Sequence, residues 1–69
     1  MNTIEFVNVR SGVERKVGPF TYVQLTYEVL RVGVAAVDEA DRELELAVYE
    51  NNLWTLLSDK TTWTDIIIT

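Results

Sequence analysis

Hydrophobic and polar residues alternate along most of this 69-residue chain, a pattern that predicts β-strands. Thr3–Arg10 is rich in β-branched and aromatic residues, as a strand would be. Ser11-Gly12 is a turn dipeptide, and Val13–Val17 forms the predicted return strand. Gly18-Pro19 ends that strand, because proline has no N–H for a ladder hydrogen bond. The first residues of the chain therefore predict a β-hairpin.

The next segment, residues 20–33, carries signals for both ends of a helix. Thr21 and Gln24 have the spacing of a capping box, and Phe20 and Leu25 have the spacing of a hydrophobic staple. Gly33 stands where a left-handed residue would end the helix. These signals predict one helix of about three turns after the hairpin.

The same segment also fits a strand. Apolar residues alternate with other residues over positions 22–29: Val23, Leu25, Tyr27 and Val29 against Tyr22, Gln24, Thr26 and Glu28. This period of two is rich in residues that favour strands. We favour the helix, because two boundary motifs would otherwise have to coincide by chance. The strand interpretation leaves an all-β fold, a small barrel or a meander, as the alternative.

Residues 42–50 form the clearest strand of the chain. Alternation predicts that three side chains face the core: Leu44, Leu46 and Val48. It predicts that four face solvent: Glu43, Glu45, Ala47 and Tyr49. Val34–Asp41, before this strand, is interpreted as a connection. After it we expect a turn at Asn51-Asn52, a short strand or irregular segment at Leu53–Leu57, and a final strand at Trp63–Thr69.

This order of elements predicts a single domain over residues 1–69 of the α+β class. One helix packs across one face of a mixed sheet in the order ββαβ(β)β, which is the order of the β-grasp. Both tryptophans, Trp54 and Trp63, are expected in the core or at its edge. The alternative is that one of them is an exposed anchor for a partner.

Three stretches of the chain resemble a known family. They are Phe6–Gly12 with Val17–Pro19, Phe20–Leu25, and Leu53–Lys60 running to Asp65–Thr69. They are similar to the opening hairpin, the helix start and the final loop and strand of the prokaryotic ubiquitin-like β-grasp proteins. The domains of bacterial multi-ubiquitin polypeptides are the most similar of these.

The resemblance implies a protein that partners recognise or that is carried within a polyprotein. Ubiquitin-like modifiers are conjugated through a flexible tail that ends in glycine. Here Thr69 follows directly on Ile66–Ile68 and no glycine tail is present in the sequence. We therefore expect either a piece of a longer polyprotein or a module that binds partners without being attached to them.

Composition excludes several kinds of chemistry. The chain contains no cysteine and no histidine, so it lacks thiolate nucleophiles, the usual general base and the commonest metal ligand. We expect no enzymatic activity, no cofactor and no metal site. A small domain without disulfides favours a reducing compartment, and we expect a cytoplasmic location. No apolar stretch approaches the roughly 20 residues of a membrane span, so no membrane association is expected.

The net charge of −5 is unevenly distributed. Acidic residues concentrate between Asp38 and Glu50, where Arg42 is the only basic residue, and the other basic residues are scattered along the chain. No basic stripe is present, so we do not expect direct nucleic-acid binding. An acidic surface favours a protein partner with a basic surface.

The candidate binding site is the acidic face of the clearest strand, with Glu43, Glu45, Ala47 and Tyr49. Arg15 would be its neighbour if the strands pair as in a β-grasp. Glu43 and Glu45 lie on a predicted solvent face without an apolar pocket to raise either pKa. We therefore expect a non-catalytic protein-interaction module that binds through this face.

Two further hypotheses stay open at this point. The chain could be an acidic accessory protein of a phage or mobile element that inhibits a host nucleic-acid-binding factor by offering carboxylates in place of phosphates. It could also form a homodimer through Ile66–Ile68 if that strand lies at a sheet edge.

Overall fold

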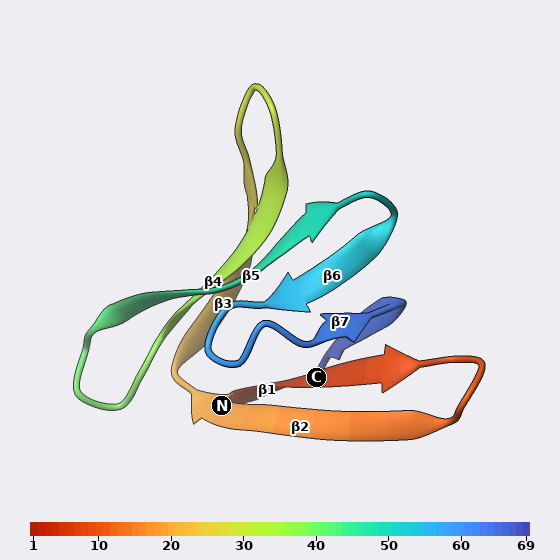
Figure 1. The fold of residues 1–69 in the computed structure, drawn as a ribbon. Coiled ribbons are helices and arrows are strands. Elements are labelled where there is room, and N and C mark those ends of the chain that lie inside the picture. Colours follow the sequence, from red (N-terminus) through yellow and green to blue (C-terminus); the bar gives the residue numbers. More distant parts are fainter.

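The computed structural model describes residues 1–69, which form eight strands and no helix (Figure 1). The strands are β1 (Asn2–Asn8), β2 (Val13–Phe20), β3 (Tyr22–Tyr27), β4 (Val32–Val37), β5 (Glu43–Glu50), β6 (Leu53–Leu56), β7 (Thr62–Trp63) and β8 (Asp65–Ile68). They form a three-stranded sheet in the order β2-β1-β8 and a five-stranded meander in the order β3-β4-β5-β6-β7. The predicted α+β, β-grasp-like fold is therefore wrong, and the all-β alternative is confirmed.

The predicted helix is wrong because the alternation of residues 22–27 outweighs the end signals around it. Tyr22–Tyr27 is β3, and it pairs along its whole length with β4. The residues that resembled a helix start form a corner instead: the Thr21 N–H donates to the Val37 carbonyl at 2.8 Å, and Phe20 is buried. Gly33 lies in the middle of β4, where a Cβ atom would come within 2.9 Å of the Thr26 hydroxyl oxygen. A close approach between strands, rather than a helix end, explains this glycine.

Two more boundaries differ from the sequence prediction. Val34–Asp41 is not a plain connection, because its first half belongs to β4 and only the rest forms the turn to β5. The strand β2 continues through Gly18-Pro19, where Gly18 has a φ of +132° and the pairing with β1 shifts register. An edge strand tolerates proline, because only one of its sides takes part in a ladder.

The strand prediction for residues 42–50 is confirmed by β5, and the turn at Asn51-Asn52 is confirmed by the two positive φ angles there, 53° and 65°. A two-residue turn with positive φ at both positions suits the twist of a hairpin. The predicted final strand is divided at Thr64. Its first part, β7, pairs with β6 in the large sheet, and its second part, β8, pairs with β1 in the small sheet.

The core lies between the two sheets. Its eight residues come from both sheets: Ile4, Phe6, Phe20, Val34, Ala36, Ala47, Leu56 and Trp63. The rings of Phe6 in β1 and Trp63 in β7 are 6.1 Å apart and tilted by 53°, a favourable arrangement for an aromatic pair. Trp54 packs against the margin of the same core. The expectation that both tryptophans lie in the core or at its edge is therefore confirmed.

The five-stranded sheet has two faces with different surroundings. We call the face that packs on the small sheet the inner face and the opposite one the outer face. Directly paired residues of antiparallel strands share a face, so the register assigns each side chain to the inner or the outer face.

No element of the structure could cross a membrane as a helix, since none is helical.

Candidate functional site

The predicted acidic face is divided by a bulge in β5. The register with β4 shifts between Val34 and Ala35, which leaves Leu46 without a direct partner. Glu43 and Glu45 pair with Val37 and Ala35 on the outer face of the sheet. Beyond the bulge, alternation resumes with the opposite phase, because an extra residue turns every later side chain to the other face.

The four predicted residues therefore do not form one surface. Ala47 pairs with Val34 and is completely buried in the core. Tyr49 also lies on the inner face, where its ring contacts the ring of Trp54 at a centroid distance of 5.0 Å. The expectation that Ala47 and Tyr49 share a face with Glu43 and Glu45 is wrong, since alternation in sequence cannot reveal an unpaired residue.

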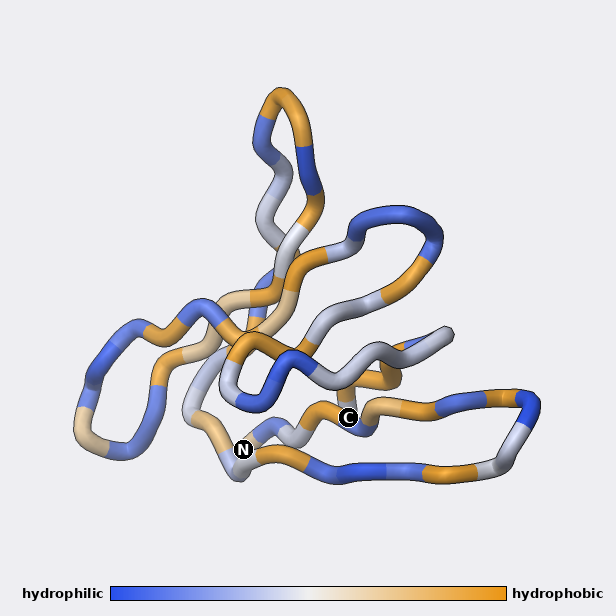
Figure 2. Tube along the Cα trace, viewed as in Figure 1, coloured by the Kyte–Doolittle hydropathy of each residue, from blue (hydrophilic) through white to orange (hydrophobic).

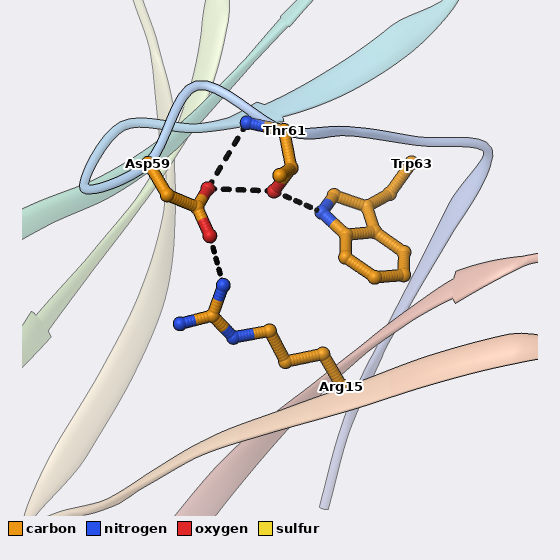
Figure 3. A network of polar contacts seen from close by, with 4 residues as sticks. All are labelled: Arg15, Asp59, Thr61 and Trp63. Atoms are coloured by element: carbon orange, nitrogen blue, oxygen red, sulfur yellow. Dashed lines mark hydrogen bonds and ion pairs between the residues drawn. The ribbon is translucent and has the colours of Figure 1, made fainter.

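Arg15 is not a neighbour of the two glutamates either. It lies in β2 opposite Phe6, and β2 pairs only with β1. The guanidinium of Arg15 forms an ion pair with Asp59, in the loop between β6 and β7 (Figure 3). The neighbourhood expected from the β-grasp is therefore wrong, because Arg15 and Glu43 belong to different sheets.

The ion pair belongs to a chain of polar contacts that joins the two sheets (Figure 3). Asp59 accepts hydrogen bonds from the N–H and the hydroxyl of Thr61 at 3.0 and 2.6 Å. The Thr61 oxygen in turn accepts the indole N–H of the core residue Trp63 at 2.8 Å. Hydrogen bonds from Thr61, together with Arg15, lower the pKa of Asp59 below its ordinary value of 3.8. All of these groups satisfy one another, so this network has a structural role.

The outer face of β4 carries the small or compact residues Gly33, Ala35 and Val37, which the register places between side chains of β3 and β5. A pocket of about 90 Å³ lies at the end near the turn to β5, lined by Tyr22, Gln24, Ala35, Ala36, Val37 and Glu43. Small-molecule sites typically measure roughly 300–1,000 Å³, so this pocket has room for one side-chain head group.

Glu43 and Glu45 have different surroundings. Glu45 already binds a cation, because the guanidinium of Arg31 lies 3.2 Å from its carboxylate. Arg31 also lies 3.7 Å from the carboxylate of Glu28. Glu43 has no ion pair and no side-chain hydrogen bond anywhere in the chain. Glu45 is thus paired with an arginine of the protein itself, whereas Glu43 presents a free carboxylate at the pocket.

A wider hollow of about 330 Å³ lies beside the turn between β4 and β5, but its acidic group is already used. Asp38 accepts hydrogen bonds from the N–H groups of Ala40 and Arg42 and from the Arg42 side chain at 2.9–3.0 Å. The backbone N–H of Arg42 contributes most to lowering the pKa of Asp38. Asp38 therefore holds the turn together and offers nothing to a ligand.

The hairpin between β3 and β4 projects from the molecule and ends in apolar residues (Figures 1 and 2). Val29 is fully exposed, and Leu30 and Tyr27 are 94% and 74% exposed.

No cluster of three or more acidic side chains converges where a metal ion could bind. The pocket at Glu43 is therefore the one place where an unpaired charged group, an aromatic ring and a concave surface meet.

The residues that surround Glu43 do not stand out in the sequence as site residues. The sequence predicts a helix at Tyr22 and Gln24 and a connection at Ala35 and Val37. The period of two over residues 22–29 was the signal for the first pair, and the run of small residues from Gly33 to Ala36 was the signal for the second.

Searches of family models, curated protein sequences and solved structures gave no match to this chain.

Proposed function

We propose that this protein is a non-catalytic protein-interaction module that binds an arginine or lysine side chain of a basic partner in the pocket at Glu43. The observation that supports this most directly is the free carboxylate of Glu43 at the wall of a pocket sized for one head group. The proposal places the protein in the cytoplasm, as expected from the sequence.

Each part of the pocket suits a long cationic side chain. The Glu43 carboxylate would pair with the ammonium or guanidinium group. The half-exposed ring of Tyr22 offers a face for a cation–π contact. The floor at Ala35 and Val37 would contact the methylene groups, since lysine and arginine lay their stems on apolar surface. The carboxylate of Glu45, on the same face of the sheet, already pairs with the guanidinium of Arg31, which supports an arginine as the partner of Glu43.

The charge of the whole molecule supports the same kind of partner. A net charge of −5 attracts a basic surface over several ångströms and raises the rate of encounter. A single exposed ion pair contributes at most about 1 kcal/mol, so the pocket selects the docking position while further contacts supply most of the affinity.

Binding of a hexa-arginine peptide tests the proposal, with Glu43→Gln as the informative variant. Removing the carboxylate should weaken binding about fivefold, the equivalent of roughly 1 kcal/mol for one exposed ion pair. Isothermal titration calorimetry at low salt measures the change. A hexa-glutamate peptide should not bind.

The matched control is Glu50→Gln. Glu50 lies on the same strand, about 23 Å farther along, and has no ion pair, so its removal changes the net charge by the same amount. Its effect on binding should stay below about twofold. Equal losses in the two variants would mean that the peptide responds to net charge alone, and the pocket would have no special role.

A further inference from the structure

The strand β3 has one free edge. It is the last strand of the five-stranded sheet, and its only partner is β4. The N–H of Glu28 donates to the Arg31 carbonyl at 2.9 Å, so Glu28 and Arg31 form a hydrogen-bonded pair at the end of the β3–β4 ladder. Hydrogen-bonded and non-hydrogen-bonded pairs alternate in antiparallel strands, so Val23, Leu25 and Tyr27 direct their backbone groups away from β4. These groups have no partner within the chain.

This edge lacks the features that usually protect an edge strand. Tyr22–Tyr27 contains no charged residue, no proline and no bulge. The side chains of Leu25 and Tyr27 are 43% and 74% exposed beside it. Natural proteins guard long edges with lysine, proline or bulges, because an open edge is a template for another strand.

The other edges differ in this respect. The edge strand β2 carries Glu14, Arg15 and Lys16 as well as a proline. The strand β7 has only two residues. The strand β8 does lie at an edge, as the sequence hypothesis of a dimer through Ile66–Ile68 required, but it has four residues and begins with Asp65. Among the edges, β3 is therefore the only one that is both long and uncharged.

We propose that β3 pairs with β3 of a second copy of this chain, antiparallel and about a twofold axis through Leu25. Leu25 then lies opposite Leu25 of the second copy, and Val23 lies opposite Tyr27. The backbone groups that are free in one copy would form about six hydrogen bonds across the axis. The proposal does not depend on the proposed function.

The uncharged edge allows a second copy to pair there, and the self-complementary side chains of β3 favour it as the occupant. Two molecules with a net charge of −5 repel each other wherever acidic surfaces meet. Pairing through β3 sets no like charges opposite each other, since the strand is neutral throughout. It also creates favourable cross-strand pairs, because a β-branched Val23 meets the aromatic ring of Tyr27 and the two Leu25 side chains meet each other.

Single cysteine variants test the register directly, because the natural chain contains no cysteine. In the proposed dimer the two Leu25 Cα atoms lie about 5.5 Å apart, a distance that a disulfide spans. Leu25→Cys should therefore form a cross-linked dimer under mild oxidation. Tyr27→Cys is the control: its side chain is more exposed, but the two copies of residue 27 would lie roughly 13 Å apart.

We expect Leu25→Cys to cross-link at least about tenfold faster than Tyr27→Cys, because pairing raises the local concentration of the correctly placed thiol. Light scattering of the unmodified chain should show the mass rise from 7.9 kDa toward twice that value with concentration. Leu25→Lys should abolish the rise, while Ile67→Lys, which adds the same charge on β8, should preserve it.

Several results would overturn the proposal. These are equal cross-linking of the two cysteine variants, a mass of 7.9 kDa at every concentration up to about 1 mM, and a dimer that Ile67→Lys disrupts while Leu25→Lys does not. If Leu25→Lys fails to fold, the comparison of Leu25→Cys with Tyr27→Cys still decides the proposal. If Leu25→Lys and Leu25→Glu both fold, their two charges would meet across the axis, so the mixture should dimerise where neither variant does alone.

Discussion

At the scale of single residues, Asp59 forms a polar link between the two sheets. It contacts Arg15 of the small sheet and Thr61 of the loop between β6 and β7 at the same time. Its lowered pKa means that the folded protein binds a proton there less readily than the unfolded chain. The carboxylate therefore stabilises the fold above pH 3.8, and this contribution is lost as the pH falls toward the folded-state pKa.

Asp59→Asn should lower the melting temperature at pH 7, because the amide cannot replace the ionic contact with Arg15. The difference from the unmodified protein should shrink as the pH drops below about 3.8. Thermal melts followed by circular dichroism between pH 2.5 and 7 measure this dependence. A difference that stays constant over the whole range would show that the carboxylate charge is not the cause.

Glu14→Gln is a control for Asp59→Asn, because it should change the melting temperature at pH 7 in the opposite direction. On the side of the small sheet that faces away from the core, a side-chain hydrogen bond and repulsion between Glu5 and Glu14 raise the pKa of Glu5 above 4.5. A raised carboxyl pKa favours the fold at low pH, and this contribution is lost as the pH rises through the folded-state pKa. Removing the Glu14 charge should therefore raise the melting temperature at pH 7, and the gain should fade below about pH 4.5.

At the scale of elements, the small residues of β4 allow the close packing of three strands. A Cβ atom on Gly33 would lie 2.9 Å from the Thr26 hydroxyl oxygen and 3.1 Å from the Ala47 carbonyl oxygen. The first contact can relax by rotation of a side chain, but the second involves backbone and cannot relax in that way.

Gly33→Ala should therefore destabilise the protein by about 1–3 kcal/mol, the usual cost of overpacking. Urea unfolding measures the free energy. The double variant Thr26→Ala/Gly33→Ala should recover part of the loss, since it removes the nearer of the two contacts. No loss in the single variant would contradict the packing described for β4.

The strands show which features the sequence could predict. The period of two in the sequence located β1 and β5 closely, even though burial does not alternate regularly along β5, where Ala47 and Val48 are both buried. Alternation could not reveal the bulge at Leu46, since an extra residue leaves the sequence pattern intact and changes only the pairing. Ala47 and Tyr49 were therefore assigned to the wrong face, and only Glu43 and Glu45 of the predicted site stay together.

The segment from Phe20 to Gly33 shows why local signals failed. Each helix-end signal has another cause in the fold: Phe20 fills the core, Thr21 turns the corner between sheets, and Gly33 avoids a clash. Such causes are tertiary, and tertiary context overrides a weak local preference.

At the scale of the whole molecule, the architecture depends on two short corners. Thr21 and Thr64 each connect the two sheets, and the N–H of Thr64 donates to the Val7 carbonyl at 3.0 Å. Dividing the last strand at Thr64 places Trp63 against Phe6 in the core and β8 beside β1. The sequence of residues 63–69 reads as one continuous strand, so this exchange between sheets could not be predicted from it.

At the same scale, the pocket at Glu43 and the free edge of β3 would act together. A dimer formed through β3 would place both pockets on the same face of one continuous sheet, because directly paired strands keep their faces aligned. The two pockets would be offset by roughly 14 Å across the strands and roughly 14 Å along them, so they would lie about 20 Å apart. A partner with two basic side chains at that separation would bind both pockets and gain from their linkage.

The most direct test of the central claim is an NMR titration of the 15N-labelled protein with the hexa-arginine peptide. The account predicts that the largest amide shifts cluster at the pocket, at Tyr22, Gln24, Ala35, Val37 and Glu43, and that Glu43→Gln needs about fivefold more peptide to reach the same shifts. Shifts centred instead on the turn at residues 38–41, on the apolar hairpin tip or on the small sheet would contradict it.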